Sequence, residues 1–240
     1  MNKRRLDAEL TARGLVPTRS QAESWIKLGK VTVDGKVITK SGHFVTEASD
    51  IKLTATEQYV SRAGLKLASV AKLLNVNFKG TIVLDVGSST GGFTDYALQN
   101  GAAKVFAVDV GTDQLHPSLH DNEKIELHEK TDIRDFIPSE TPDVIVIDVS
   151  FISLREILPH LARSVAGKNT KIVAMVKPQF EAGRNQTNKG VIKNDSVRRQ
   201  ILKDFEMWAK DLFVIIDKRD SDVAGARGNQ ERFYLLTCSR

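Results

Sequence analysis

Four charged residues are expected to gather at one edge of a sheet: Lys66, Asp148, Lys177 and Glu231. The first lies in an amphipathic stretch, and the other three flank apolar runs typical of buried strands, at the sheet edge where open α/β folds bind ligands. Two lysines and two carboxylates that converge there balance one another's charges. A lysine withdrawn from water gives up its proton more readily, so it can deprotonate a poor nucleophile such as a hydroxyl. Each residue also has an ordinary alternative: a surface lysine, a helix cap, a strand end and a surface ion pair, respectively.

A loop of small residues predicts a cofactor that carries a nucleoside. Residues 81–93, TIVLDVGSSTGGF, combine a short apolar run, an acid at Asp85 and a glycine-rich turn that opens a helix. Small residues let backbone N–H groups at a helix N-terminus approach a ligand closely. The spacing departs from the G-x-G-x-x-G of dinucleotide sites, and a carboxylate here repels a pyrophosphate but attracts an ammonium group. These features favour S-adenosylmethionine over NAD.

A second acid completes the predicted cofactor unit. The next apolar run, KVFAVD, ends on Asp109. A carboxylate at the tip of the second strand accepts the ribose hydroxyls of a bound nucleotide in doubly wound folds. Strand, glycine turn, helix and strand-end acid are therefore mutually consistent, with an ordinary tight turn and a surface acid as the alternative.

The elements that position these residues alternate in the α/β manner. Strands are expected at residues 81–86, 104–109, 124–129, 142–149, 171–176, 211–217 and 232–238, and an amphipathic helix over 61–75. Continuous apolar runs are typical of central parallel strands covered on both faces. Residues 218–230 form a polar loop, so the last two strands are expected to be antiparallel neighbours at one side. The fold class is α/β, the methyltransferase version of a Rossmann-like doubly wound sheet.

Residues 1–56 are predicted to form a separate small α+β domain, joined by residues 57–60 to a main domain over 61–240. Helices are expected over 4–15 and 20–29, with Ser20 as N-cap, and VTVDGKVIT predicts a hairpin around Asp34 and Gly35. Basic side chains accompany the helices, which favours a nucleic-acid partner over a merely solvated face. These residues are Lys3, Arg4, Arg5, Arg19, Lys27 and Lys30.

The N-terminal pattern resembles a known RNA-binding module. RLDAEL, followed by Gly14, Arg19, Ala22, Ile26, Gly29 and VTVDG, is similar to the αL domain named after a ribosomal small-subunit protein. That module also occurs in pseudouridine synthases and tyrosyl-tRNA synthetases. The resemblance covers about the first fifty residues and implies RNA binding through the basic face.

Six segments along nearly the whole chain resemble the TlyA family, relatives of the FtsJ-type ribose methyltransferases that are often labelled hemolysins. They are YVSRAGLKL, DVGSSTGGFTD, VDVGTDQLH, DVSFISL, VKPQFEAGR and GNQERF. The resemblance implies S-adenosylmethionine-dependent 2′-O-methylation of ribosomal RNA, with a cytidine acceptor and a Lys-Asp-Lys-Glu tetrad at the four charged positions above. Beside Asp85, it also implies cofactor binding by Gly87, Ser88, Gly91, Gly92, Phe93, Asp109 and Asp132.

Composition narrows the cellular setting. The chain has 240 residues, 26.6 kDa and a net charge of +5, which permits two domains and a polyanionic partner such as ribosomal RNA or ribosomal subunits. It lacks the run of about 18 apolar residues that spans a bilayer, and MNKRRLDAEL lacks a signal-peptide core, so a cytoplasmic protein without membrane contact is expected. Cys238 is expected to be a buried thiol, and the histidine spacing predicts no metal site.

Two other functions are open at this point. One is a membrane-active toxin, although the apolar runs are strand-length and the helices have a single core-facing stripe. The other is a non-catalytic RNA-binding factor for ribosome assembly that keeps the cofactor fold as a scaffold. The intact acid, lysine and glycine positions argue against that scaffold.

Overall fold

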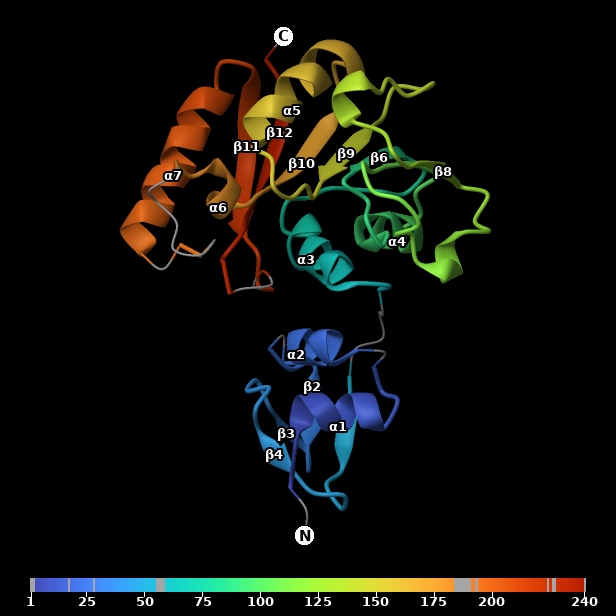
Figure 1. The fold of residues 1–240 in the computed structure, drawn as a ribbon, viewed down its shortest axis with the longest axis vertical. Coiled ribbons are helices and arrows are strands. Elements are labelled where there is room, and N and C mark those ends of the chain that lie inside the picture. The colour runs from blue at the N-terminus through green and yellow to red at the C-terminus, as the bar shows by residue number, and fades with distance from the viewer. Residues whose placement is uncertain are drawn as a thin grey trace.

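The computed structural model describes residues 3–16, 18–27, 29–54, 59–183, 191–192, 194–223, 225 and 228–239. Figure 1 shows a small N-terminal domain and a larger domain built around a seven-stranded sheet. The predicted join over residues 57–60 falls partly on residues 55–58, which lie outside the described residues.

The main sheet has the strand order β11-β12-β10-β9-β6-β7-β8. The bounds are β6 Ile82–Val86, β7 Lys104–Val108, β8 Ile125–His128, β9 Val144–Ile147, β10 Lys171–Val176, β11 Phe213–Asp220 and β12 Arg232–Cys238. Strands β6 to β10 pair in parallel, whereas β12 runs antiparallel to both β10 and β11. The predicted fold class is confirmed. The loop predicted from residue 218 is wrong for its first three residues, because β11 continues to Asp220 along β12.

Helices cover both faces of the sheet, which explains the continuous apolar runs. On one face, α3 (Arg62–Ala71) and α4 (Gly92–Gln99) pack against β6, β7 and β9 through side chains such as Val83 and Val105. On the other face, α5 (Leu154–His160) and α7 (Asp195–Ala209) pack against the alternate side chains, such as Leu84 and Phe106. The shorter elements are the 3₁₀ turns η1 (Pro117–Leu119) and η2 (Ile133–Asp135), the π-helical turn η3 (Leu161–Val165) and α6 (Pro178–Glu181).

The strand order reverses beside β6. From β6 the chain continues to β7 on one side, and later returns to β9 on the other side. Open α/β sheets bind ligands outside the carboxyl ends of their strands at such a reversal. The segments that follow β6, β9 and β10 therefore lie where a ligand site is expected.

The N-terminal domain combines α1 (Leu6–Ala12) and α2 (Arg19–Lys27) with short strands. A three-stranded sheet has the order β3-β2-β5, with β2 Val31–Val33, β3 Lys36–Val37 and β5 Ile51–Leu53, and β1 (Arg4–Arg5) pairs with β4 (Phe44–Val45). The hairpin turn at residues 34–35 is confirmed, with φ of 50° and 76°. Two predicted helix starts are wrong: residues 4 and 5 form a strand, and α2 begins at Arg19, one residue before the predicted cap position Ser20. The Thr18 hydroxyl accepts the Gln21 N–H at this end of the helix.

Candidate active site

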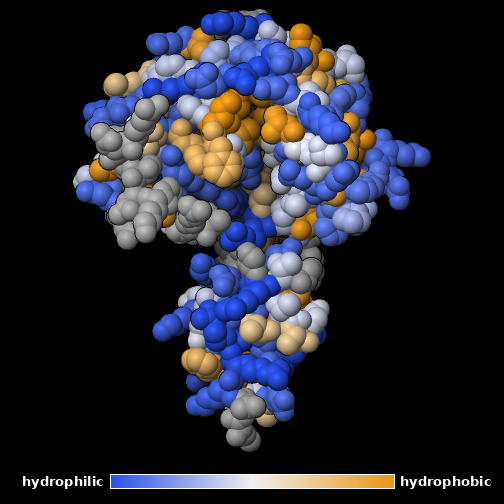
Figure 2. Space-filling model, viewed as in Figure 1, coloured by the Kyte–Doolittle hydropathy of each residue, from blue (hydrophilic) through white to orange (hydrophobic). Residues whose placement is uncertain are grey.

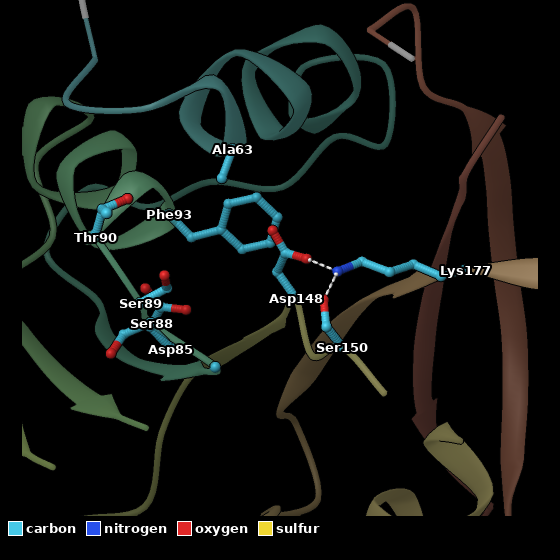
Figure 3. A pocket seen from close by; sticks show the side chains of 10 residues that line it. Ala63, Asp85, Ser88, Ser89, Thr90, Phe93, Asp148, Ser150 and Lys177 are labelled. Carbon is cyan, nitrogen blue, oxygen red and sulfur yellow. Dashed lines mark hydrogen bonds and ion pairs between the residues drawn. The ribbon is translucent and has the colours of Figure 1, made fainter. Parts of the chain in front are cut away.

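Two lysine–carboxylate pairs lie at the carboxyl end of the sheet. The Lys177 Nζ lies 2.6 Å from Asp148 Oδ1 and donates a hydrogen bond to Ser150 Oγ at 2.8 Å (Figure 3). The Lys66 Nζ donates to Glu231 Oε2 at 2.5 Å. Each lysine is only 9% exposed. Pairs this buried make each charge depend on its partner, because removing one leaves the other uncompensated in a poorly solvated place.

The register of the sheet brings the two pairs near each other. Val176 of β10 faces Arg232 of β12, and one further step along this antiparallel register sets Lys177 opposite Glu231. Asp148 directly follows β9, which pairs with β10 on its other side. Three adjacent strand ends therefore supply three of the four predicted residues.

The fourth residue, Lys66, is positioned by α3. The Ser61 side chain caps this helix by accepting the Ala63 N–H, which fixes where the first turn begins. Ala63 lines the same cavity as Lys177, and Lys66 follows it by three residues on the same helix face. Lys66 is thereby directed at Glu231, which comes from just before β12.

The ordinary alternatives for three of these residues are wrong. Asp148 does not cap the following helix, because Ser153 Oγ accepts the Arg155 N–H at the start of α5. Lys66 is not a surface lysine, and Glu231 is not a surface partner for a neighbouring arginine, because both side chains are buried. Each carries a charge that the other compensates.

A cavity of about 150 Å³ lies between the glycine-rich loop and the Lys177–Asp148 pair (Figure 3). Gly87 has a φ of 80°, and a Cβ there would lie 2.8 Å from the Asp148 carbonyl oxygen, so only glycine lets the loop pack this closely against the segment after β9. Gly91 and Gly92 do not line this cavity, nor do they line the larger second cavity described below. They start α4, and a Cβ on Gly92 would collide with Ser61 Oγ of the α3 cap. Predicted residues in the lining are Asp85, Gly87, Ser88, Phe93, Asp148 and Lys177.

Two buried polar atoms in this cavity have unused hydrogen-bonding capacity. Among the residues that the structure describes, the Asp85 Oδ1 and the Ser88 Oγ have no hydrogen-bond partner. Burial raises the pKa of Asp85 to about 7, against the Thr94 hydroxyl, which donates to Oδ2 at 2.7 Å, and with a smaller rise from the Asp148 carboxylate. A cationic ligand group would favour ionised Asp85, so the site fits the ammonium end of S-adenosylmethionine.

A second cavity of about 450 Å³ continues from the first and holds the two other predicted acids. The Asp109 carboxylate accepts the Ser89 N–H at 2.8 Å and the Gly111 N–H at 2.7 Å, which fixes its orientation. Asp132 accepts from the backbone and guanidinium of Arg134, which holds the pKa of this carboxyl at about 2. Both acids are thus ordered groups on the wall of a cavity large enough for a nucleoside.

Two residues after β9 were missed by the sequence analysis. Ser150 lines both cavities and binds Lys177, and Phe151 beside it lines the larger cavity. Phe151 is 91% exposed, has a φ of 65° and packs its ring 5.2 Å from that of Phe180. A bulky residue in the left-handed region is uncommon and is a sign of a functional loop.

The N-terminal basic residues are partly tied into the fold. Asp7 is buried and accepts from Arg5 at 2.7 Å and from Arg19 at 3.1 Å. Burial works to raise the pKa of Asp7, but the hydrogen bonds from the two arginines hold it at about 2. Lys27 and Lys30 are exposed, and Figure 2 shows that mainly hydrophilic side chains cover this domain in that view. The module thus has both a braced arginine pair and freely solvated lysines.

Three further expectations concern the rest of the chain. Cys238 is half-buried at the end of β12 rather than fully buried. Within the described ranges, the histidine, cysteine and acidic side chains form no cluster of three that could hold a metal. Over the same part of the chain, no helix has the length and apolarity that a membrane span requires.

Comparison with known proteins places this site in a family. The FtsJ-like methyltransferase model matches residues 59–238, and the S4 domain model matches residues 4–51. The Mycobacterium tuberculosis protein named 16S/23S rRNA (cytidine-2'-O)-methyltransferase TlyA is 36% identical over 239 residues, covering 97% of this chain and 89% of that protein. Hemolysin A of Brachyspira hyodysenteriae is 36% identical, covering 95% of this chain and 97% of that protein.

A solved structure from Streptococcus thermophilus has the same architecture. It is 38% identical, superposes with a TM-score of 0.72, and the match covers 99% of this chain and 89% of that one. The resemblance drawn from the six sequence segments is therefore confirmed. The chain belongs to the FtsJ-like methyltransferase family, whose members use S-adenosylmethionine, and carries an S4 domain at its N-terminal end.

Proposed function

We propose that this enzyme methylates a ribose 2′-hydroxyl of ribosomal RNA, with cytidine as the acceptor nucleoside. One observation carries the proposal: the Lys177 Nζ lies 2.6 Å from Asp148 Oδ1 at the rim of the cavity beneath the glycine-rich loop. A methyltransferase acting on a hydroxyl needs a proton acceptor beside the methyl donor. The TlyA relative named for cytidine-2′-O-methylation supports the choice of acceptor.

Lys177 is proposed to act as the general base. In its amine form it would accept the hydroxyl proton at Nζ, so that the ribose oxygen could take the methyl group while the donor's sulfur keeps the electrons of the broken C–S bond. Asp148 Oδ1 compensates the positive charge that Nζ gains, and Ser150 Oγ fixes the direction of the amine. The Lys66–Glu231 pair lies beside this group and keeps the local charges balanced as the proton moves.

Bound S-adenosylmethionine would supply the electrophilic methyl group on its sulfonium. Asp85 and Ser88 would bind its amino-acid end, because their unpaired oxygen atoms face the smaller cavity. Asp109 and Asp132 would bind the adenosine end in the larger cavity. Gly87 would keep the loop close to the segment that carries Asp148, since even a methyl side chain would meet the residues after β9.

The S4 domain is proposed to hold the RNA by its phosphates, with Lys3, Arg4, Arg5, Arg19, Lys27 and Lys30 as the contact residues. Phosphate contacts set position without reading sequence, so the module would deliver a structured RNA while the catalytic domain modifies one exposed ribose. A ribosomal substrate would place the enzyme in the cytoplasm. The proposed domains are residues 1–56 and 61–240.

Replacing Lys27 and Lys30 together by glutamine should weaken RNA binding about ten-fold near physiological salt. Each lysine that contacts a phosphate steepens the dependence of log K on log salt by about one, so the slope should fall by about two. Filter binding over a salt series measures both quantities. The matched control is Lys36→Gln with Lys40→Gln, which removes the same charge beside the hairpin. Equal losses in the two double variants would contradict the proposed RNA face.

Gly225→Ala should lower turnover about ten-fold without changing cofactor affinity. A Cβ at this position would lie 2.6 Å from Glu231 Oε1, so the carboxylate must move away from Lys66. A displacement of about 1 Å at a catalytic group costs up to 10²-fold in rate. Single-turnover methyl transfer and cofactor titration separate the two effects. The melting temperature of the variant measures the general cost of the substitution for stability. Unchanged turnover would remove Glu231 from the proposed machinery.

The proposed function is tested by incubating the full-length enzyme with ribosomal subunits and cofactor labelled on its methyl group. The expected result is labelled ribosomal RNA that yields 2′-O-methylcytidine after nuclease digestion. Tight RNA binding without transfer would instead support the assembly factor. Release of dye from lipid vesicles by the same preparation, with no transfer, would support the toxin.

A further inference from the structure

We propose that Glu181 is a positioning residue that locks the loop bearing Asp148 and Ser150 onto the segment bearing Lys177. The side chain of Glu181 is 1% exposed. Its Oε2 accepts the Ser153 hydroxyl at 2.6 Å, and its Oε1 accepts the Leu154 N–H at 2.7 Å. The inference rests on the proposed role of Lys177.

Glu181 joins the same two segments that the catalytic contacts join. Lys177 caps α6, and Glu181 is the last residue of that single turn. On the facing segment, Ser153 caps α5 and Leu154 begins it, five and six residues after Asp148. The contacts of Lys177 with Asp148 and Ser150 face the cavity, and Lys177 must change its protonation during the reaction. The contacts of Glu181 with Ser153 and Leu154 are buried and stay the same.

The hydrogen bonds of Glu181 to Ser153 and Leu154 require a carboxylate. Two donors bond to Glu181, the Leu154 N–H and the Ser153 O–H, and an ionised carboxylate accepts at both oxygens. The Arg155 guanidinium makes a third contact, with its Nε 3.6 Å from Oε2, and its positive charge also favours an ionised carboxylate. A glutamine amide accepts at one oxygen and presents its NH₂ to the other donor. The carboxylate also lies at the N-terminus of α5, where negative charge is favourable. Burial raises the pKa of Glu181, with these two hydrogen bonds acting in opposition.

Loss of the Glu181 contacts should lower kcat and leave the binding of cofactor and RNA nearly unchanged. The ring contact between Phe151 and Phe180 is the third link across the two segments, so they should stay together without Glu181 but lose their exact spacing. The Nζ of Lys177 would then sample positions away from Asp148. The reaction rate depends steeply on the position of a catalytic group, and a displacement of about 1 Å lowers the rate up to 10²-fold.

The test compares full-length Glu181→Gln with Glu206→Gln. Glu206 is a matched control, because it accepts from Lys218 and Tyr234 on the α7 side and touches neither segment. Glu181→Gln should lower kcat at least about ten-fold and leave KM for cofactor and RNA within about two-fold. Glu206→Gln should lower the melting temperature without changing kcat. Equal kcat losses in both variants, or a Glu181→Gln loss confined to KM, would overturn the proposal.

A double-mutant cycle with Ser150→Ala separates positioning from general destabilisation. If Glu181 acts through the Lys177 contacts, its kcat loss should shrink at least about three-fold when Ser150 is already absent. Full additivity would overturn the proposal. Ser153→Ala, which removes one donor, serves if Glu181→Gln does not fold, with a smaller loss in the same direction expected. If Glu181→Gln is fully active and Lys177→Ala is inactive, this inference alone is contradicted. If Lys177→Ala is active, the proposed function is contradicted.

Discussion

Replacing Lys177 by alanine is expected to lower the rate of methyl transfer about 10³-fold while cofactor affinity stays within about two-fold. General base catalysis contributes about 10²–10⁴-fold, and this substitution removes the proton acceptor. The proposed cofactor contacts, Asp85 and Asp109, lie outside the Lys177 ion pair and are untouched. Single-turnover transfer from labelled cofactor measures the rate, and calorimetric titration measures the affinity.

Lys171→Ala is the control for this substitution. Lys171 lies at the opposite end of β10, so the variant removes a lysine from the same strand without touching the carboxyl edge. It should transfer methyl groups at the wild-type rate. Undiminished turnover of Lys177→Ala, or a cofactor affinity that falls in step with its turnover, would contradict the assigned role.

Replacing Asp85 by asparagine is expected to remove a pH-dependent cost of folding. The folded protein holds the Asp85 proton more tightly than the unfolded chain, since burial raises its pKa from 3.8 to about 7. The stability from this group is therefore complete below about pH 4 and is lost as the pH rises through about 7. At about 1.4 kcal/mol per pKa unit, the loss by pH 8 is on the order of 4 kcal/mol.

Urea unfolding of the cofactor-free wild type and Asp85→Asn at pH 5 and pH 8 measures how much of this stability is lost over that range. The free energy of unfolding should fall with pH more steeply in the wild type than in Asp85→Asn. Cofactor binding should change in the opposite sense. An ammonium group pairs with the ionised carboxylate, so the cofactor affinity of the wild type should rise between pH 6 and 8. The affinity of Asp85→Asn should stay about ten- to a hundred-fold weaker than that of the wild type. Parallel pH profiles of stability in both proteins would contradict the assignment.

Sequence reasoning predicted residues that the structure brings together at the carboxyl end of the sheet, because strand ends and glycine turns are local signals. The apolar runs before Asp148 and Lys177 gave both their strands and their edge of the sheet. The partner of Lys66 is a different matter, since Glu231 lies 165 positions away and the contact exists only after β12 has paired with β10. Ser150 and Glu181 were missed for the same reason, because each acts through a tertiary contact between segments distant in sequence.

Charge on the N-terminal domain shows a second limit of pattern reading. Asp7 has the appearance of an acid in the first turn of a helix, yet it is buried and binds two of the arginines assigned to RNA. Side chains that look equally basic in sequence thus differ in how firmly they are held. The helix predicted over 61–75 likewise ends at Ala71, because residues 72–75 form a turn that closes with Asn75 in the left-handed region, at a φ of 53°.

The location of the transferred methyl group tests the central claim most directly. Alkali cleaves RNA through the free 2′-hydroxyl, so a linkage beside a 2′-O-methylated nucleotide resists hydrolysis. Ribosomal RNA labelled by the wild-type enzyme should therefore release its label in alkali-resistant dinucleotides, and the Lys177→Ala enzyme should give none. Label recovered in mononucleotides would mean that a base is methylated, and would contradict a lysine that deprotonates a ribose hydroxyl.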